Sequence, residues 1–256
     1  MSRLFFLSVL SLFTCCYLDD NNNSVSSGKN FNQPDSLNVV ADIAPPPGYK
    51  RMNLAGASFG EWLENIALKK DRHVYLYNGA LKRNQSAQFA VLDITVGNKD
   101  LQQCADALMR LRAEYLFSQK RYSEIEFSDN AHKSYKWTGG SDKTGFDKYL
   151  EKVFSMCGSA SLEKQLKPVA SLADMQPGDV FIKGGFPGHA MIVMDVAKNE
   201  RGQKVFMLAQ SYMPAQDVHI VKNPADIKIS PWYEVSDEPE IFTPEWTFLK
   251  DQLRRW

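Results

Sequence analysis

The sequence lacks an excess of charge of either sign. Thirty Lys and Arg residues stand against thirty Asp and Glu residues, so the formal net charge is zero. Proteins that bind nucleic acid or an anionic bilayer through their charge carry a basic excess, and this chain has none. We therefore expect no nucleic-acid partner. With 44% apolar residues over 256 positions, the composition predicts a soluble globular protein with a substantial core.

Motifs for nucleotide, cofactor and metal binding are also missing. No Walker loop, glycine-rich dinucleotide fingerprint or HExxH zinc motif occurs in the sequence. The spacing of the four histidines matches no pattern of metal ligands. They are His73, His132, His189 and His219. We therefore expect neither a metal nor a cofactor.

Cysteine is scarce, and two of the four cysteines lie near the N-terminus. Residues 1–16, "MSRLFFLSVLSLFTCC", join one positive charge to an apolar run that has signal-peptide length and is too short to span a bilayer. They resemble a bacterial lipoprotein signal, in which Cys15 or Cys16 would be lipidated after cleavage. An ordinary secretory signal is the alternative. The lipoprotein interpretation predicts an exported protein that is anchored to the bacterial envelope by its acyl chains alone, at the outer membrane or the cell surface.

The next segment is polar and rich in turn-forming residues. Residues 17–48 begin "YLDDNNNSVSSGKN" and end near the stiff "APPPGY". Such a composition buries too little apolar surface to offset the entropy lost on ordering. We expect a flexible tether over residues 17–48 and a single globular domain over residues 49–256.

Two helices can be predicted early in this domain. Ser58, followed three residues later by Glu61, is a capping-box pattern that predicts a short helix. In "NKDLQQCADALMRLRAEYLFSQKRY", apolar residues recur at spacings of three and four, which predicts a long helix with Asp100 as its cap. Between them, "HVYLYNG" and "QFAVLDITVG" predict a hairpin closed by a turn at Asn78 and Gly79.

Strand-like runs dominate the second half of the chain. After two shorter helical segments, "DVFI", "HAMIVMDVA" and "KVFMLAQSY" are separated by glycine-containing turns, which predicts an antiparallel meander. Helices first and strands afterwards predict an α+β fold, in which a layer of helices packs on an antiparallel sheet.

His189 is the first candidate for catalytic chemistry. It follows "KGGFPG" at the head of a strand-like run, where Gly185 and Gly188 allow the backbone to pass close to another group at that edge. An imidazole at the mouth of a strand can act as a general base near neutral pH. The alternative is a core histidine with one satisfied hydrogen bond.

The corresponding nucleophile would be Cys104. It lies in the first turn of the long predicted helix, where free backbone amides and the helix dipole favour a thiolate. A thiol at a helix start beside a sheet that supplies histidine is the arrangement of cysteine hydrolases. Two alternatives stay open. Cys104 can be a small core residue of the apolar stripe, or it can form a disulfide with Cys157 in an oxidising compartment.

Polar neighbours complete this candidate site. Gln210, at the end of the next strand, can accept a hydrogen bond from the imidazole and orient it, with His219 as a weaker alternative. Gln103, or Gln102, can donate to an oxyanion together with the backbone amide of Cys104. The residues expected to contact a substrate are Gly185, Gly188, Ser211 and Tyr212.

The phrase "LADMQPGDVFIKGGFPGHAMIVMDV" resembles the histidine half of the CHAP and NlpC-type domains of the papain-like amidase superfamily. The resemblance implies a papain-like core with a nucleophilic cysteine that opens an upstream helix, the position of Cys104. It also implies cleavage of amide bonds in cell-wall peptides. The residues around Cys104 differ from the usual "DCSG" or "CTW" pattern, and Gln210 replaces the usual Asn, His or Glu.

A second resemblance covers nearly all of residues 49–256. Phrases such as "GASFGEWLENIAL", "LQQCADALMRLRAEYL" and "AQSYMPAQDVHIVKNP" are similar to the bacterial family called domain of unknown function 4846, whose members are exported or lipid-anchored. That family brings no established activity. The main hypothesis is a thiol amidase or peptidase acting on murein or other peptide amides. The alternatives are a non-catalytic envelope protein that binds a peptide or glycan, and a purely structural lipoprotein.

Overall fold

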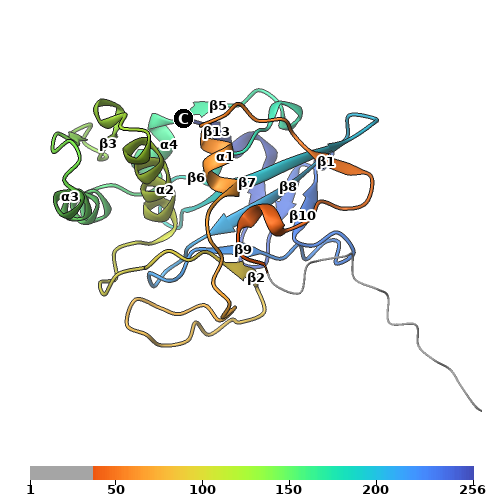
Figure 1. Ribbon diagram of the computed structural model, residues 1–256, viewed down its shortest axis with the longest axis horizontal. Coiled ribbons are helices and arrows are strands. Elements are labelled where there is room, and N and C mark those ends of the chain that lie inside the picture. Colours follow the sequence, from red (N-terminus) through yellow and green to blue (C-terminus); the bar gives the residue numbers. More distant parts are fainter. Residues whose placement is uncertain (1–36) are drawn as a thin grey trace, which may run out of the picture.

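The computed structural model describes residues 37–256 (Figure 1). The predicted signal peptide, its lipidation candidates Cys15 and Cys16, and residues 17–36 of the predicted tether lie outside the described residues. The described chain is mixed α+β, with one large antiparallel sheet and a small number of helices, which confirms the predicted α+β class.

A nine-stranded antiparallel sheet forms the centre of the fold. Seven of its strands lie in the order β2 (Gln88–Val91), β9 (His219–Val221), β8 (Lys204–Gln210), β7 (His189–Asn199), β6 (Val180–Lys183), β13 (Leu253–Arg255) and β5 (Lys167–Pro168). In addition, β1 (Tyr49–Arg51) pairs with β7, and β10 (Trp232–Glu234) pairs with β8. The predicted meander is confirmed as β6–β7–β8, in which Lys183 lies opposite His189.

Four α-helices lie in the described part of the chain. They are α1 (Phe59–Glu64), α2 (Cys104–Ser118), α3 (Lys143–Met156) and α4 (Ser159–Gln165). Figure 1 shows α2, α3 and α4 gathered on one side of the molecule, next to the sheet. The remaining short elements are the hairpins β3 (Glu126–Ser128) with β4 (Ser134–Lys136) and β11 (Glu240–Phe242) with β12 (Thr247–Leu249), and 3-10 turns at Val40–Asp42, Tyr122–Glu124, Leu172–Asp174 and Lys250–Gln252.

Both faces of the central strands are covered. Along β7, Ala190 and Ile192 belong to the core that packs against the helices, whereas Met191 and Val193 belong to a second core on the opposite face, together with Phe248 of β12. A strand covered on both sides reads as a continuous apolar run, which is why "HAMIVMDVA" shows almost no polar alternation. Helices therefore pack on one face of the sheet, and apolar side chains that include Phe248 cover the other face.

The start of the first predicted helix is confirmed, whereas the cap predicted for the second helix is wrong. Ser58 accepts a hydrogen bond from the Glu61 backbone amide at 3.2 Å, as predicted. The long helix begins at Cys104 itself, with Gln103 as its N-cap, so the predicted cap at Asp100 is wrong. Asp100 instead accepts a hydrogen bond from the Ala215 backbone amide at 2.7 Å, because the loop after β8 folds over this turn.

The predicted hairpin is only partly present. Tyr75 and Leu81 form an isolated bridge around the turn at Gly79, whose φ is +82°. The segment "QFAVLDITVG" contributes β2, which pairs with β9 and not with the Tyr75 segment. Pairing with β9 joins β2 to the large sheet, where Val91 is completely buried.

The folded region begins earlier than the predicted boundary at residue 49. Val40 and Ile43 are completely buried, and the Trp232 indole donates a hydrogen bond to the Ala44 carbonyl oxygen at 2.9 Å. Residues 37–48 are therefore packed, which corrects the last part of the predicted tether. Apolar residues at spacings of three, in an otherwise polar stretch, provide this packing and were hidden in the average composition. None of the helices in the described region has the length and apolarity needed to cross a membrane.

Candidate functional site

One cavity of about 540 Å³ brings together most of the residues predicted from the sequence. Its wall includes the N-terminal turn of α2, the connection between α3 and α4, and the loop between β6 and β7. Cys104, the first residue of α2, and His189, the first residue of β7, both line it. The other predicted residues on its wall are Gln103, Gly185, Gly188 and Tyr212.

Cys104 is a largely buried thiol on the wall of this cavity. Only 9% of this residue is exposed, and burial raises the pKa of its thiol to about 11, with a further contribution from the charge of Asp106. The backbone amides of Ala105, Ala190 and Cys104 act in the opposite direction and lower this pKa. Cys104 and His189 line the same cavity, so one wall carries both the thiol and the imidazole. The thiol is protonated at neutral pH.

The His189 ring is enclosed by aromatic side chains. Its centroid lies 4.7 Å from that of Tyr212, 5.3 Å from Trp246 and 5.9 Å from Phe248. Burial lowers the pKa of His189 to about 4, while the hydrogen bond with Gln210 and the charge of Glu245 oppose this change. The imidazole is therefore neutral at neutral pH and able to accept a proton.

The amide of Gln210 determines which nitrogen of His189 accepts that proton. Gln210 Oε1 lies 2.8 Å from His189 Nε2, and Gln210 Nε2 lies 2.8 Å from Glu245 Oε2. A carboxylate only accepts hydrogen bonds, so the amide NH₂ group must face Glu245 and the amide oxygen must face His189. His189 Nε2 therefore carries the hydrogen, and Nδ1 remains unprotonated. The predicted role of Gln210 in orienting the imidazole agrees with this geometry.

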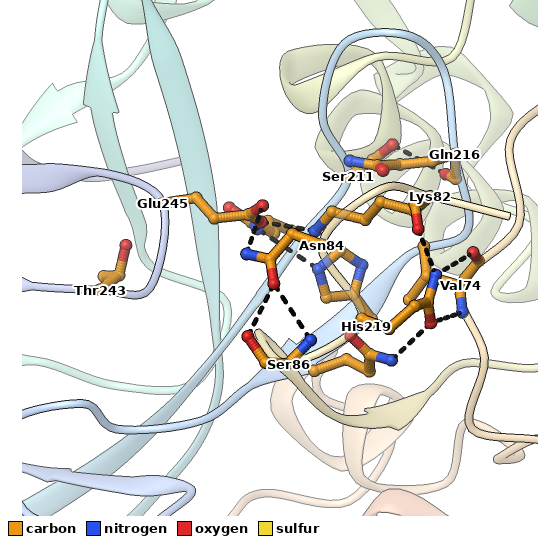
Figure 2. A network of polar contacts seen from close by, with 12 residues as sticks. Val74, Lys82, Asn84, Ser86, Ser211, Gln216, His219, Thr243 and Glu245 are labelled. Carbon is orange, nitrogen blue, oxygen red and sulfur yellow. Dashed lines mark hydrogen bonds and ion pairs between the residues drawn. The ribbon is translucent and has the colours of Figure 1, made fainter.

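Two further contacts hold the Glu245 carboxylate in place. Figure 2 shows Lys82 and Asn84 directed toward Glu245; the Lys82 ammonium lies 2.5 Å and the Asn84 amide nitrogen 3.2 Å from its oxygens. These three residues could not be found from the sequence, because they come from separate loops and belong to no motif. The aromatic phrase "PEWTF" around Glu245 was the only local signal.

His219 supports Gln210 and does not replace it. Its Nδ1 lies 2.9 Å from the Asp217 carbonyl oxygen, which only accepts, so Nδ1 carries the hydrogen and Nε2 is an acceptor. Gln210 Nε2 lies 3.3 Å from this acceptor. Burial lowers the pKa of His219 to about 3, so the ring stays neutral. Both hydrogens of the Gln210 amide are thus used, one by Glu245 and one by His219.

The structure separates the remaining predicted residues. The Gln103 amide lines the cavity and donates one hydrogen to Asp100 at 3.1 Å, which leaves its second hydrogen for an oxyanion. Gln102 does not line this cavity and binds Arg110 at 2.5 Å. Ser211 is completely buried, with its hydroxyl 2.8 Å from the Gln216 carbonyl oxygen. The predicted substrate contact of Ser211 is therefore absent, because the hydroxyl is used inside the protein.

Cys157 is the second thiol on the cavity wall. It ends α3 and is free, as is Cys104, so the disulfide considered from the sequence is not formed in this structure. Burial raises the pKa of Cys157 to about 12, and the charge of Asp106 adds to this effect. Among the described residues, no group of three or more His, Cys, Asp or Glu side chains is arranged to hold a metal ion.

Comparisons with known proteins give one match. The sequence model of a family described as "Domain of unknown function (4846)" matches residues 39–141 and 128–255. No curated protein and no solved structure matches the chain. The matched region includes Cys104, His189 and Gln210, together with Lys82 and Glu245 behind them.

Proposed function

The chain belongs to the family described as domain of unknown function 4846, and this family implies no activity. From the residues of the cavity, we propose that the protein is a thiol amidase or peptidase. Cys104 is the nucleophile and His189 the base. One observation carries the proposal: a thiol at a helix N-terminus and an imidazole of defined tautomer line the same cavity.

The proposed reaction follows from the protonation states. His189 Nδ1 takes the thiol proton as the Cys104 sulfur attacks the amide carbonyl carbon and forms a C–S bond. The free amide hydrogen of Gln103 and the backbone amide of Cys104 stabilise the oxyanion. The C–N bond then breaks, and His189 returns the proton to the departing amine. Water hydrolyses the thioester, breaks the C–S bond and restores the thiol.

The neutral resting pair implies that proton transfer accompanies the attack. With the pKa of Cys104 raised to about 11 and that of His189 lowered to about 4, both by burial, a preformed thiolate–imidazolium pair is unfavourable in the empty cavity. Gln210 stabilises the imidazolium once it forms, because its oxygen accepts the Nε2 hydrogen. Glu245 stabilises the same cation through its negative charge.

The substrate class and location extend the proposal. The packing of α2, headed by Cys104, on β7, headed by His189, supports a papain-like core. An exported, lipid-anchored protein would meet peptides at the envelope, so the proposed substrates are murein peptides or other peptide amides of the envelope.

Replacing both Cys15 and Cys16 by Ala should move the protein from the detergent phase to the aqueous phase in a detergent partition, because the acyl chains are lost. An unchanged detergent fraction would contradict the anchor.

A non-catalytic binding protein is the second candidate, and one observation favours it. Side chains alternate along β7, so His189 lies on the face of Met191, while α2 packs on the face of Ala190. The His189 side chain thus points to the face opposite α2, and its ring bonds to Gln210, with no hydrogen bond to the Cys104 thiol among the described residues. In a binding protein the cavity would hold a peptide or glycan without turnover.

Substitution of the thiol decides between the two candidates. Murein peptides are incubated with the purified protein, with Cys104→Ala and with Cys157→Ser, and released amines are counted. The thiol amidase predicts release by the wild type and Cys157→Ser and none by Cys104→Ala. Peptide that binds all three proteins without release supports the binding protein. Release that survives in Cys104→Ala would refute the proposed mechanism.

A further inference from the structure

We propose that Asp106 makes this cavity selective for ligands that carry a protonated amino group. Hydrolysis of such ligands rests on the proposed thiol amidase, whereas the selectivity requires only that they bind. The proposal stands on an unpaired carboxyl oxygen, on the charges of the cavity wall and on the position of Asp106 beside the thiol.

Asp106 is a buried carboxyl group with one oxygen unused. It lies in the first turn of α2, lines the cavity, and is only 6% exposed. Its Oδ2 accepts a hydrogen bond from the Gln103 backbone amide at 3.1 Å, whereas Oδ1 is buried and has no hydrogen-bond partner within residues 37–256. Leaving a buried polar atom unpaired is costly, so native proteins rarely do so without a reason such as a ligand.

The charges of the cavity wall favour a cationic partner. Two carboxylates, Asp100 and Asp106, line the cavity, and its wall contains no Lys or Arg side chain. Asp100 already accepts hydrogen bonds from the Ala215 backbone amide and the Gln103 side chain. Asp106 is therefore the carboxyl group that lacks compensation. Burial holds its pKa well above the usual range, and a bound ammonium group would stabilise its ionised form.

The amino group would bind close to the reacting bond. Asp106 shares the first turn of α2 with Cys104, and both line the cavity together with Cys157. A second unpaired atom, the buried indole Nε1 of Trp246, belongs to the same cavity wall and can donate to a carbonyl group. An ammonium group for Asp106 and a carbonyl oxygen for Trp246 are the two polar groups of an amino-acyl unit.

The mouth of the cavity suits an apolar portion of the same ligand. Three of the large apolar side chains exposed in the described region lie at this cavity: Phe186 is 98% exposed, Met213 63% and Met156 48%. Exposed apolar side chains grouped around a cavity are typical of a binding surface. We therefore expect ligands that combine a free amino group with a bulky apolar side chain.

The test measures binding without turnover. Full-length Cys104→Ala is titrated calorimetrically at pH 7 with the dipeptide Phe-Ala-amide and with its N-acetylated form, which differ in the ammonium charge. We expect the free amine to bind at least tenfold more tightly. In Asp106→Asn, made in the same background, this preference should disappear, because Asn still accepts from the Gln103 amide but carries no charge. Asp147→Asn, an exposed change of equal charge on α3, is the matched control.

Each outcome has a defined meaning. Equal affinity for the two dipeptides, no detectable binding of either, or a preference that persists in Asp106→Asn would overturn the proposal. If Asp106→Asn does not fold, the comparison of the two dipeptides on Cys104→Ala alone decides. Amine selectivity without any hydrolysis by the wild type would refute the thiol amidase and leave this inference intact. Equal hydrolysis of free and acetylated peptides would do the reverse.

Discussion

At the scale of single residues, the orientation of one glutamine amide determines which nitrogen of His189 can act as a base. Gln210 has two hydrogens and one oxygen to place, and Glu245 and His219 each accept one hydrogen. The oxygen is left for His189. In the reverse orientation, the Gln210 oxygen would face two acceptors and the hydrogen bonds to Glu245 and His219 would be lost. The tautomer of His189 therefore follows from the contacts that Gln210 makes with Glu245 and His219.

The variant Glu245→Gln tests this dependence. Its side-chain amide can donate as well as accept, so the Gln210 amide can turn and present NH₂ to His189 Nε2. We expect the hydrogen to move to Nδ1 and kcat to fall by about 100-fold, the lower end of what a general base contributes. Nitrogen NMR of the His189 ring and steady-state kinetics measure these effects. Glu240→Gln on β11 is the control, and an unchanged tautomer would contradict the argument.

A second prediction at this scale concerns the reactivity of Cys104. Its thiol ionises only near its raised pKa of about 11, and only the thiolate is alkylated. In Cys157→Ser, where Cys104 is the remaining thiol of the described region, the rate of reaction with iodoacetamide should rise about tenfold per pH unit from pH 7 to pH 9.5. A rate that levels off below pH 8 would instead demonstrate a stabilised thiolate.

At the scale of elements, the loop between β6 and β7 forms one wall of the cavity. Gly188 lies where the loop meets α4: a Cβ atom there would be 2.5 Å from the Gly185 carbonyl oxygen and 2.5 Å from the Ser159 hydroxyl. Gly185 has a φ of +120°, which disfavours other residues. Glycine in "KGGFPG" therefore allows close backbone packing beside His189, as the sequence suggested.

Gly188→Ala should destabilise the protein by about 1–3 kcal/mol, because the added methyl group has no space. Gly158→Ala is the matched control, since Gly158 lines the same cavity and a Cβ atom there would meet nothing within 4 Å. Urea unfolding of both variants gives the free energies of unfolding. Equal losses for the two variants would show that crowding at Gly188 is not the cause.

Helices and strands were predictable to different degrees, for a physical reason. The apolar spacing around Leu108 and Leu111 reports a helix whose hydrogen bonds are all local, and α2 is found there. The partner of a strand is decided by distant segments. The pairing predicted for "QFAVLDITVG" was therefore wrong, because this segment pairs with β9 of the large sheet.

At the scale of the whole molecule, a buried ionic group joins the N-terminal segment to the sheet. Arg51 donates to Asp195 of β7 at 2.6 Å and to the Ile43 carbonyl oxygen at 2.7 Å. Burial raises the pKa of Asp195 to about 7; the charge of Glu64 adds to the increase, and the guanidinium of Arg51 opposes it. Glu64 Oε1 is itself buried and unpaired within the described residues.

The stability of the fold should depend on this group. Asp in an unfolded chain loses its proton near pH 3.9, whereas folded Asp195 keeps it until about pH 7. The folded state binds more protons in this interval, so Asp195 should lower the free energy of unfolding as the pH rises from about 4 to 7. Glu64→Gln removes a repulsive charge and should reduce this loss by about 1.4 kcal/mol for each unit by which it lowers the Asp195 pKa.

Urea unfolding at pH 5 and pH 8 measures the loss in the wild type and in Glu64→Gln. Glu200→Gln, an exposed change in the turn between β7 and β8, is the control of equal charge. An identical difference between the two pH values in Glu64→Gln and the wild type would show that Glu64 does not act on Asp195.

The sequence by itself determined the α+β class, the start of α1, the helix that begins at Cys104 and the β6–β7–β8 meander, because each depends on local spacing. The chemistry of single residues made Cys104, His189 and Gln210 the candidates for the site. Only the tertiary structure decided the contacts between distant segments. It joined residues 37–48 to the core, paired β2 with β9, and buried Ser211. It also brought Lys82, Asn84 and Glu245 together behind Gln210. Such contacts depend on which distant segments meet in the folded chain, and the residue spacing within one segment does not identify its partner.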